Sequence, residues 1–337
     1  MKISSEEIAK LANVSRSTVS RVINNYSNVP DETRRRVMEV IEKYDYHPHP
    51  SARVLAGKAN QMILLCISDY NDGKNRWRGT ESPYFIRMIA ALVSQSKEYG
   101  YLISVFIVTE EADYGKIENM FFNREVCAGI FIGFEFPFQI SHMNRLIMKG
   151  FSMVIIDPGT GVMEAENVRK VFSENLQAGY MATSYLLKQG HRYIAHLAGD
   201  HRMSSQDRLK GYEKAMKEAD IPEESIWIAR GNFESNLSYQ SAVKLMENHL
   251  ITAIFAGNDL MAVCALRAAR DLGRHVPENI AIVGCDYTVT YRNLGFDLTS
   301  IELSVDEIAA RAVKAALGME SEQNIYCKAT FHKGSSA

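Results

Sequence analysis

The first 46 residues carry apolar side chains at the spacing of short amphipathic helices. Ile8, Leu11 and Ala12 form one apolar stripe, which follows a pair of serines suited to cap a helix. Asn13 then interrupts the stripe with a residue type that tolerates the left-handed backbone of a tight turn. The pattern therefore predicts a helix, a tight turn and a second helix capped by Ser15.

The second predicted helix separates its two faces. Val19, Val22 and Ile23 lie on one side. The other side carries arginines, which can pair bidentately with guanine, and short polar side chains that let a helix lie deep in the major groove. A solvated amphipathic helix would show the same pattern. The residues of this polar face are Arg16, Ser17, Ser20, Arg21 and Asn24.

A third helix is predicted to open at Pro30, with acids in its first turn, and to be ended by Pro48 and Pro50. Two short helices joined by a tight turn and braced by a third make a helix-turn-helix. We therefore interpret residues 1–46, the head, as an all-α DNA-binding domain. The buried positions of the third helix are predicted to be Val37, Val40, Ile41 and Tyr44.

From residue 60 onwards, in the body, apolar runs alternate with helical runs. This alternation predicts parallel α/β sheets, and the number of units suits two sheets, with a first crossing in the turn-rich segment 158–161. The predicted strands are 62–67, 102–108, 129–132, 153–156, 193–197, 227–229, 253–256 and 280–284. The clearest predicted helices are 84–99, 176–189, 206–219, 239–248 and 259–271.

Composition and charge narrow the class of protein. Hydrophobic residues make up 46% and charged residues 23% of the 337, as in a globular protein. The apolar runs fall short of the ~18 residues of a membrane helix, and acids stand where a signal peptide is apolar, so we expect a cytoplasmic protein. Residues 1–58 hold ten bases and seven acids, so the net charge of −2 divides into a basic N-terminal segment and an acidic remainder, and only the N-terminal segment should meet a polyanion. Buried reduced thiols are expected at Cys66, Cys127, Cys264, Cys285 and Cys327.

Several stretches resemble the lactose-repressor (LacI/GalR) family of transcription regulators. They are Ile8–Asn24 (IAKLANVSRSTVSRVIN), Val29–Arg34, Tyr46–Pro48 and Ala52–Leu55, and the similarity continues through the whole chain. The chain departs from the family pattern at three positions: Asn13 replaces a turn glycine, Asp45 replaces a glycine, and Pro50 stands at the start of the hinge segment.

The resemblance and the polar face together predict the DNA contacts. We expect base contacts from Arg16, Ser17 and Arg21, and phosphate contacts from Ser15, Thr18 and Asn24. Residues 47–59 are the hinge, and its segment 50–57 is too short to be helical alone. The resemblance implies that Ala52, Arg53 and Leu55 enter the minor groove, with Leu55 as a wedge between base steps. Packing of Leu55 on its own domain and a solvated linker at 52–53 are the alternatives.

For residues 60–337 the resemblance implies a periplasmic-binding-protein-like effector-binding and dimerisation domain, with two lobes, three crossings and a ligand cleft. Lobe 1 is expected at about 60–158 plus 290–319, and lobe 2 at about 162–287 plus 322–337. Ligands in such folds bind at the carboxyl ends of strands. The expected effector-binding residues are Tyr84, Phe85, Asp157, Ser204, Arg208, Phe233, Asn258 and Asp286.

The polar members of this set suit a sugar or sugar derivative, whereas Tyr84 and Phe85 resemble the stacking pair of the purine-responsive branch. Structural alternatives stay open: helix caps for Asn258 and Asp286, a surface ion pair for Arg208, and core positions for the two aromatic residues. The long loop 69–82 leads into the cleft. Its Arg76, Trp77 and Arg78 either reach the ligand or belong to a solvated loop.

Motifs of catalysis such as G-x-S-x-G, H-E-x-x-H and the Walker loop are absent from the sequence, so we expect no enzyme. His191, His196 and His201 lie five apart, but His191 matches a structural family position, so we expect neither a metal nor another cofactor. We predict a ligand-responsive repressor of carbohydrate-utilisation genes that binds a pseudo-palindromic operator as a homodimer, because the C-terminus lacks the leucine heptad of a tetramer. A nucleobase-responsive regulator, a solute receptor and a sugar-processing enzyme are the alternatives.

Overall fold

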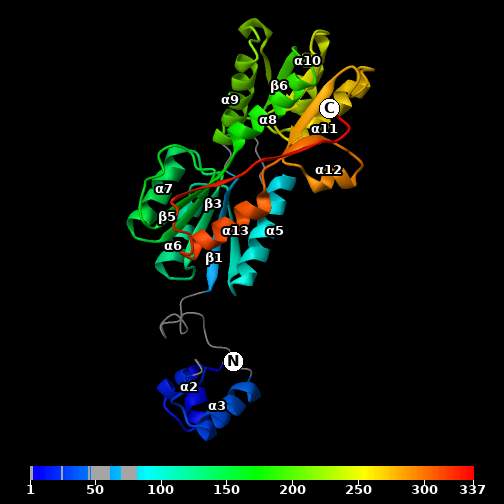
Figure 1. The fold of residues 1–337 in the computed structure, drawn as a ribbon. Helices are drawn as coiled ribbons and strands as arrows, with labels where there is room; N and C mark the ends of the chain where they lie inside the picture. The colour runs from blue at the N-terminus through cyan, green and yellow to red at the C-terminus, as the bar shows by residue number, and fades with distance from the viewer. Residues whose placement is uncertain (1–2, 24–25, 45, 47–60, 70–81) are drawn as a thin grey trace. The chain divides into compact units, whose positions relative to one another are not determined.

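The structure is a computed structural model that describes residues 3–23, 26–44, 46, 61–69 and 82–337 (Figure 1). The chain divides after residue 60 into the head and the body, which are described separately. Among the described residues, no helix is both long and apolar enough to cross a membrane.

The head has the predicted helix-turn-helix. Ser4 and Glu7 form a capping box, in which Ser4 Oγ accepts from the Glu7 N–H at 3.3 Å and Glu7 Oε2 accepts from the Ser4 N–H at 2.7 Å. Asn13 has the left-handed backbone that the sequence predicts, with φ of 50°, and the Val14 N–H donates to the Ala9 carbonyl at 2.9 Å. The helices are α1 (Ser5–Leu11), α2 (Arg16–Ile23) and α3 (Asp31–Lys43).

One position predicted to be buried in the head is wrong, because Tyr44 is 43% exposed. Leu11, a member of the apolar stripe of the first helix, is also exposed. Helix α3 ends at Lys43, ahead of the prolines, so Tyr44 leaves the helical register. The Tyr46 N–H donates to the Ile41 carbonyl at 3.0 Å, which turns the chain back and buries Tyr46 instead. The core consists of Ile8, Ala9, Ala12, Val19, Val22, Val29, Val37 and Tyr46, with Val40 and Ile41 partly buried against it.

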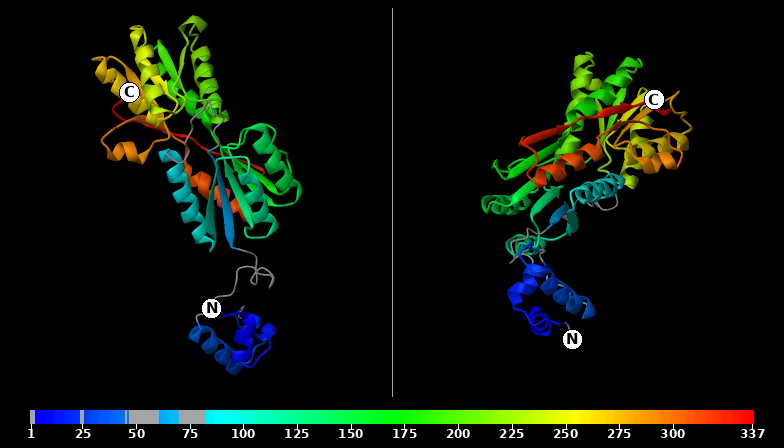
Figure 2. Two further views of the ribbon diagram at one scale, coloured as in Figure 1. Left: turned by 180° about the vertical axis from the view of Figure 1, so that it is seen from behind. Right: turned by 60° about the horizontal axis from the view of Figure 1, so that its bottom comes forward.

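The first lobe of the body is a parallel sheet with helices on both faces (Figures 1 and 2). The strands lie in the order β11-β5-β4-β3-β1-β2. Helices α5 and α13 pack on one face, and α6 and α7 pack on the other. The strands are β1 (Met62–Ser68), β2 (Leu102–Val108), β3 (Ala128–Ile132), β4 (Ser152–Ile156), β5 (Val168–Ser173) and β11 (Asn324–Cys327). The helices are α5 (Pro83–Glu98), α6 (Asp113–Phe122), α7 (Pro137–Met148) and α13 (Val305–Ala316).

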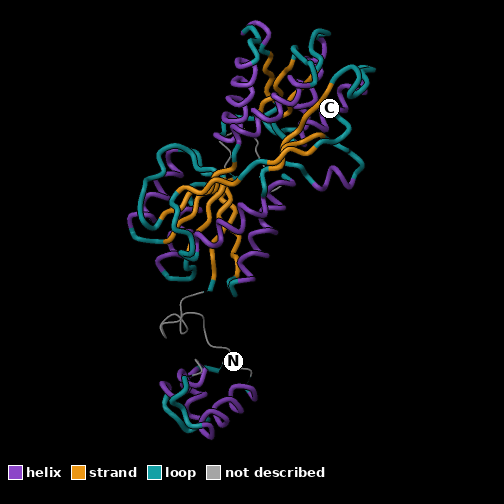
Figure 3. The backbone as a smooth tube through the Cα atoms, viewed as in Figure 1, coloured by secondary structure: helices purple, strands orange, loops and turns teal. Residues whose placement is uncertain are grey.

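The second lobe has its own sheet, in the order β12-β10-β9-β8-β6-β7, which Figure 3 shows apart from the first. Helices α8 and α9 cover one face, and α10 and α11 the other. The strands are β6 (Ile194–Ala198), β7 (Trp227–Arg230), β8 (Ala253–Ala256), β9 (Ala281–Cys285), β10 (Thr299–Glu302) and β12 (Thr330–His332), which is antiparallel to β10. The helices are α8 (Asn175–Lys188), α9 (Met203–Glu218), α10 (Ser235–Glu247), α11 (Asp259–Asp271) and the short α12 (Val289–Asn293).

The expected lobe boundaries need correction. Segment 158–161 does not cross between lobes, because residues 157–167 form the connection that parallel pairing of β4 with β5 requires. The chain crosses instead after β5, between β10 and α13, and between β11 and β12. Thus β5 and β11 belong to the first lobe, and β10 with α12 belongs to the second.

All five cysteines are free thiols. Cys66, Cys264, Cys285 and Cys327 are buried, as predicted, and Cys127 is partly buried. Burial raises the pKa of each thiol, to about 12 for Cys285 and Cys327. These side chains therefore act as small apolar groups of the strands and of α11.

Candidate functional site

The polar face of α2 is open to solvent. Arg16, Ser17 and Arg21 are exposed, and Thr18 is partly buried. Ser15 caps α2, because its Oγ accepts from the Thr18 N–H at 3.1 Å. The same Oγ lies 2.7 Å from Ser17 Oγ. The face expected to contact DNA is therefore built on a capped helix.

Arg16 forms an ion pair with Glu6 at 3.4 Å, with both side chains about two-thirds exposed. Pairs of this kind contribute little to stability, so Arg16 remains available to another anion. The other residues expected at DNA lie outside the described part of the chain: Asn24, Ala52, Arg53 and Leu55.

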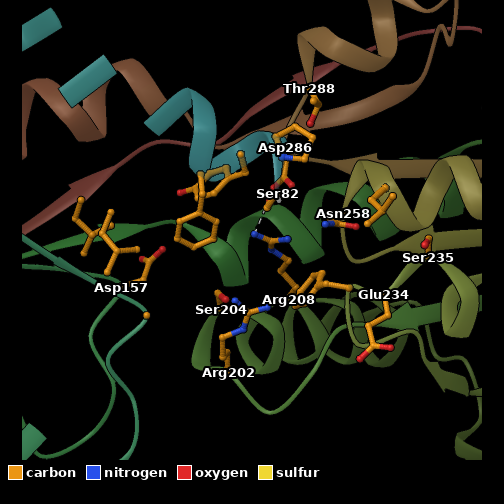
Figure 4. A pocket seen from close by; sticks show the side chains of 18 of the residues that line it. Ser82, Asp157, Arg202, Ser204, Arg208, Glu234, Ser235, Asn258, Asp286 and Thr288 are labelled. Carbon is orange, nitrogen blue, oxygen red and sulfur yellow. Dashed lines mark ion pairs between the residues drawn. The ribbon is translucent and has the colours of Figure 1, made fainter. Parts of the chain in front are cut away.

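A cavity of about 380 Å³ lies between the two lobes of the body (Figure 4). Both lobes contribute to its lining at the carboxyl ends of their strands, where α/β folds bind ligands. The first lobe provides residues that begin α5 and follow β3 and β4, and the second lobe provides residues from α9 and after β7, β8 and β9. All eight residues expected to bind an effector line it: Tyr84, Phe85, Asp157, Ser204, Arg208, Phe233, Asn258 and Asp286.

Arg208 is buried, so the alternative of a surface ion pair is wrong. Its guanidinium donates from Nε to Asn175 Oδ1 at 2.9 Å and from Nη1 to the Gly257 carbonyl. Nη2 lies 3.7 Å from Asp286 Oδ1, and Figure 4 marks this ion pair. One guanidinium thus joins the end of β8, the start of α8 and the end of β9 at the cavity.

The two aspartates of the cavity have different surroundings. Asp157 accepts from the N–H and the Oγ of Ser173, at 2.7 and 2.8 Å, and burial raises its pKa. Asp286 faces Arg208, and burial raises its pKa to about 7 although the guanidinium opposes the shift. Both residues have positive φ, 45° and 106°, a strained backbone region for a residue other than glycine that is common at ligand-binding sites. The buried carboxylate of Asp286 therefore has weaker polar contacts than that of Asp157, which accepts two hydrogen bonds from Ser173.

Asn258 is a helix cap, as one alternative proposed. Its Oδ1 accepts from the Met261 N–H at 3.0 Å at the start of α11, which leaves Nδ2 as a donor on the cavity wall. Phe85 belongs both to the hydrophobic core of the first lobe and to the lining of the cavity, and it is 8% exposed. Tyr84 meets Phe85 edge-on, with ring centroids 5.4 Å apart, and packs against the cores of both lobes.

Several lining residues were not predicted from the sequence, among them Glu135, Arg202, Glu234 and Tyr291. The rule that found Asp157 also fits Glu135, since each closely follows an apolar run that forms a strand. Arg202 lies one helical turn and a half before Arg208, with its guanidinium 4.8 Å from the Phe233 ring centroid. Tyr291 lies on α12, a short helix without an apolar repeat that would predict it.

The three spaced histidines do not converge. His196 Nδ1 contacts the Phe255 carbonyl at 2.9 Å, and burial lowers the pKa of His196 to about 4. His191 Nδ1 contacts Thr252 at 2.9 Å, and His201 lies against Phe136. Within the described ranges, no three His, Cys, Asp or Glu side chains lie close enough to hold a metal ion.

A helix-turn-helix head and a two-lobed body with a polar cavity together define the class of ligand-responsive transcription regulators. Comparison with known proteins supports this class. A model of the lacI family of bacterial regulatory proteins matches residues 6–49, and a model of a periplasmic binding protein-like domain matches residues 183–326.

Two relatives are similar over almost the whole chain. The HTH-type transcriptional regulator DegA of Bacillus subtilis (strain 168) is 30% identical, over 94% of this chain and 91% of its own length. The HTH-type transcriptional repressor PurR of Pasteurella multocida (strain Pm70) is 30% identical, over 91% and 89%. The chain therefore belongs to the lacI family, and it is a DNA-binding transcription regulator.

Two solved structures share the fold. The lac repressor dimer bound to operator and the anti-inducer ONPF has a TM-score of 0.82 at 21% identity, over 100% of this chain and 99% of that one. The transcriptional regulator CelR in complex with cellobiose has a TM-score of 0.72 at 24% identity, over 99% and 100%. The expected fold, an all-α head with a periplasmic-binding-protein-like body, is confirmed.

Proposed function

We propose that this protein is a repressor that binds a pseudo-palindromic operator as a homodimer and whose operator affinity is set by a small molecule in the cavity between the lobes. The observation that carries the proposal is the cavity itself, because residues of both lobes line it. A ligand that contacts both lobes favours one angle between them. In a dimer, this angle sets the spacing of the two hinges, in which Ala52, Arg53 and Leu55 are our candidates for the minor groove.

Charge in the cavity favours a neutral ligand that is rich in hydrogen-bond donors. The lining has four carboxyl groups, on Glu135, Asp157, Glu234 and Asp286, against the two guanidinium groups of Arg202 and Arg208. The buried carboxylate of Asp200 neutralises part of the charge of Arg202, because its Oδ1 accepts a hydrogen bond from Arg202 Nε at 2.9 Å. A phosphate or carboxylate would add a further buried negative charge, which is unfavourable. A neutral sugar has the required hydroxyl donors and is our first candidate.

A nucleobase is the second candidate, because the cavity also has flat apolar surfaces. Tyr84, Phe85, Phe233 and Tyr291 line it, and aromatic rings stack well on planar ligands. A nucleobase also satisfies the charge argument, since it is neutral and carries N–H donors.

A thermal-shift screen of the full chain separates these classes. The neutral probes are ribose, glucose and guanine. Each is compared with a phosphorylated counterpart: ribose phosphate, glucose phosphate and guanosine monophosphate. We expect stabilisation by a neutral probe, roughly 2.7 kcal/mol at a hundredfold excess over its Kd, and none by its monophosphate. Stabilisation by monophosphates alone would contradict the charge argument, and stabilisation by guanine alone would exclude the sugar.

On the DNA side, the proposal predicts that Arg21 reads a base. Footprinting on genomic DNA should recover discrete pseudo-palindromic sites, and on such a site Arg21→Ala should weaken binding by about 1–3 kcal/mol and relax specificity at one base pair of each half-site. Arg35→Ala is the control, because Arg35 lies exposed on α3, where it pairs with Glu39. Equal discrimination between cognate and scrambled DNA before and after the Arg21 change would refute this docking of α2.

A further inference from the structure

Glu135 and Met203 form a hydrogen bond that joins the two lobes at the wall of the cavity. Glu135 follows β3 in the first lobe, and its Oε2 accepts from the N–H of Met203, the first residue of α9 in the second lobe, at 3.1 Å. The first N–H groups of a helix have no partner within the helix. The side chain of the N-cap residue Arg202 cannot supply an acceptor, because a guanidinium has only donors, and it lies against Asp200 and Phe233. A carboxylate of one lobe thus caps a helix of the other.

Glu135 is fixed firmly on its own lobe. Gln139, which is fully buried, accepts at Oε1 from the N–H groups of Glu135 and Phe136, at 3.0 and 3.1 Å. Its Nε2 donates to Ser68 Oγ at the end of β1, at 2.8 Å. Gly159 packs closely against the backbone of Glu135, since a Cβ at position 159 would lie 3.0 Å from Glu135 Cα. The backbone beneath the carboxylate therefore moves with the first lobe.

The helix that Glu135 caps carries two of the expected effector-binding residues. Ser204 and Arg208 lie in the first turns of α9, and both line the cavity. The Phe136 ring lies 5.7 Å from the His201 ring just before α9, which adds a second contact between the same two segments. Separation of the lobes would break the bond to Met203 and leave the start of α9 without its cap.

We propose that Glu135 is a positioning residue for the effector cavity, whose carboxylate caps α9 when the lobes close and holds Ser204 and Arg208 in their binding positions. This role rests on the proposed function of the cavity. The start of α9 needs an acceptor oxygen, and burial raises the pKa of Glu135 to about 7, so the acceptor does not depend on a full negative charge. Capping by a hydrogen bond needs only an acceptor oxygen, so glutamine should replace Glu135 and alanine should not.

Hydrogen–deuterium exchange of the ligand-free full chain tests the cap without a known effector. In Glu135→Ala, the amides of residues 203–207 should exchange at least tenfold faster than in the wild type, whereas Glu135→Gln should stay close to the wild type. Glu166→Ala is the matched control, since Glu166 is an exposed acid of the first lobe. Unchanged exchange in Glu135→Ala, or equal loss in the alanine and glutamine variants, would overturn the proposal.

A second variant removes the donor instead of the acceptor. Met203→Pro deletes the N–H at a first helical position, which proline accepts, and Arg202 already has the extended backbone (φ −62°, ψ 148°) that a following proline needs. The Tm losses of Met203→Pro and Glu135→Ala should not add in the double variant, because both break one bond. Additive losses would overturn the proposal.

Ligand affinity then distinguishes the positioning role of Glu135 from the effector-binding role of the cavity. With a ligand from the thermal-shift screen, Glu135→Ala should raise the Kd about tenfold and Glu135→Gln should leave it nearly unchanged. If no probe stabilises the wild type while the exchange result holds, the cap stands and the proposed effector cavity fails. If a probe binds and Glu135→Ala leaves its Kd unchanged, the cavity stands and the positioning role fails.

Discussion

Replacement of Gly179 by alanine is expected to lower the free energy of unfolding by about 1–3 kcal/mol. Gly179 lies in α8, where a Cβ would come 2.0 Å from the carbonyl oxygen of Arg208 in α9. Gly211 of α9 has the reciprocal contact, since a Cβ there would lie 2.1 Å from the Leu176 carbonyl oxygen. Both obstacles are backbone atoms, so the two helices must separate to admit a methyl group.

Gly115→Ala is the control for this result. Gly115 is also a helical glycine, in α6, but a Cβ there would meet no described atom within 4 Å. Alanine should therefore stabilise this helix by up to about 1 kcal/mol, because it has the higher helix propensity. Urea denaturation of both variants measures the difference, and equal free energies of unfolding would show that α8 and α9 are not in backbone contact.

Arg208→Met is expected to remove the response to the ligand and to lower the free energy of unfolding by about 3–5 kcal/mol. The change leaves three acceptors without their donor: Asn175 Oδ1, the Gly257 carbonyl and the Asp286 carboxylate. Burial of unpaired acceptors is unfavourable. Since Arg208 also lines the cavity, a ligand that stabilises the wild type should no longer stabilise this variant.

Two further variants make the Arg208 result specific. Arg267→Met removes an exposed arginine of α11 that pairs with Asp271, and it should change stability by less than about 1 kcal/mol. The double change Arg208→Met with Asp286→Asn should recover part of the loss, because it also removes the buried charge. Denaturation and gel-shift titrations with and without ligand measure both effects. DNA affinity that still responds to the ligand in Arg208→Met would contradict the assigned role.

The strands that the sequence predicts correctly are those whose side chains are almost all apolar. The run 253–256 is an interior strand with every residue buried, and its bounds match β8. Strand β5 has the sequence VRKVFS, in which charged side chains interrupt the apolar pattern, and it was missed. Strand β11 lies at a sheet edge with alternate residues exposed. The prediction of the lobe boundaries was wrong for the same reason, because the strands that were missed are those beside which the chain passes from one sheet to the other.

The candidate site was more predictable than the lobes. One rule about the carboxyl ends of parallel strands led to Asp157, Asn258 and Asp286, which lie on one cavity. The rule says nothing about contacts between lobes, so it did not reveal that Glu135 reaches the start of α9. Nor does it separate a cap from a ligand-binding group, and Asn258 is a cap whose Nδ2 still faces the cavity wall.

The three crossings between the lobes have a consequence for synthesis on the ribosome. Strand β11 completes the first sheet beside β5, yet 150 residues separate the end of β5 at Ser173 from the start of β11 at Asn324. While those residues are being made, β5 is an unpaired edge, and such edges associate with other chains. The nascent first lobe therefore stays open until the second lobe has largely emerged, and the two lobes reach their final form together.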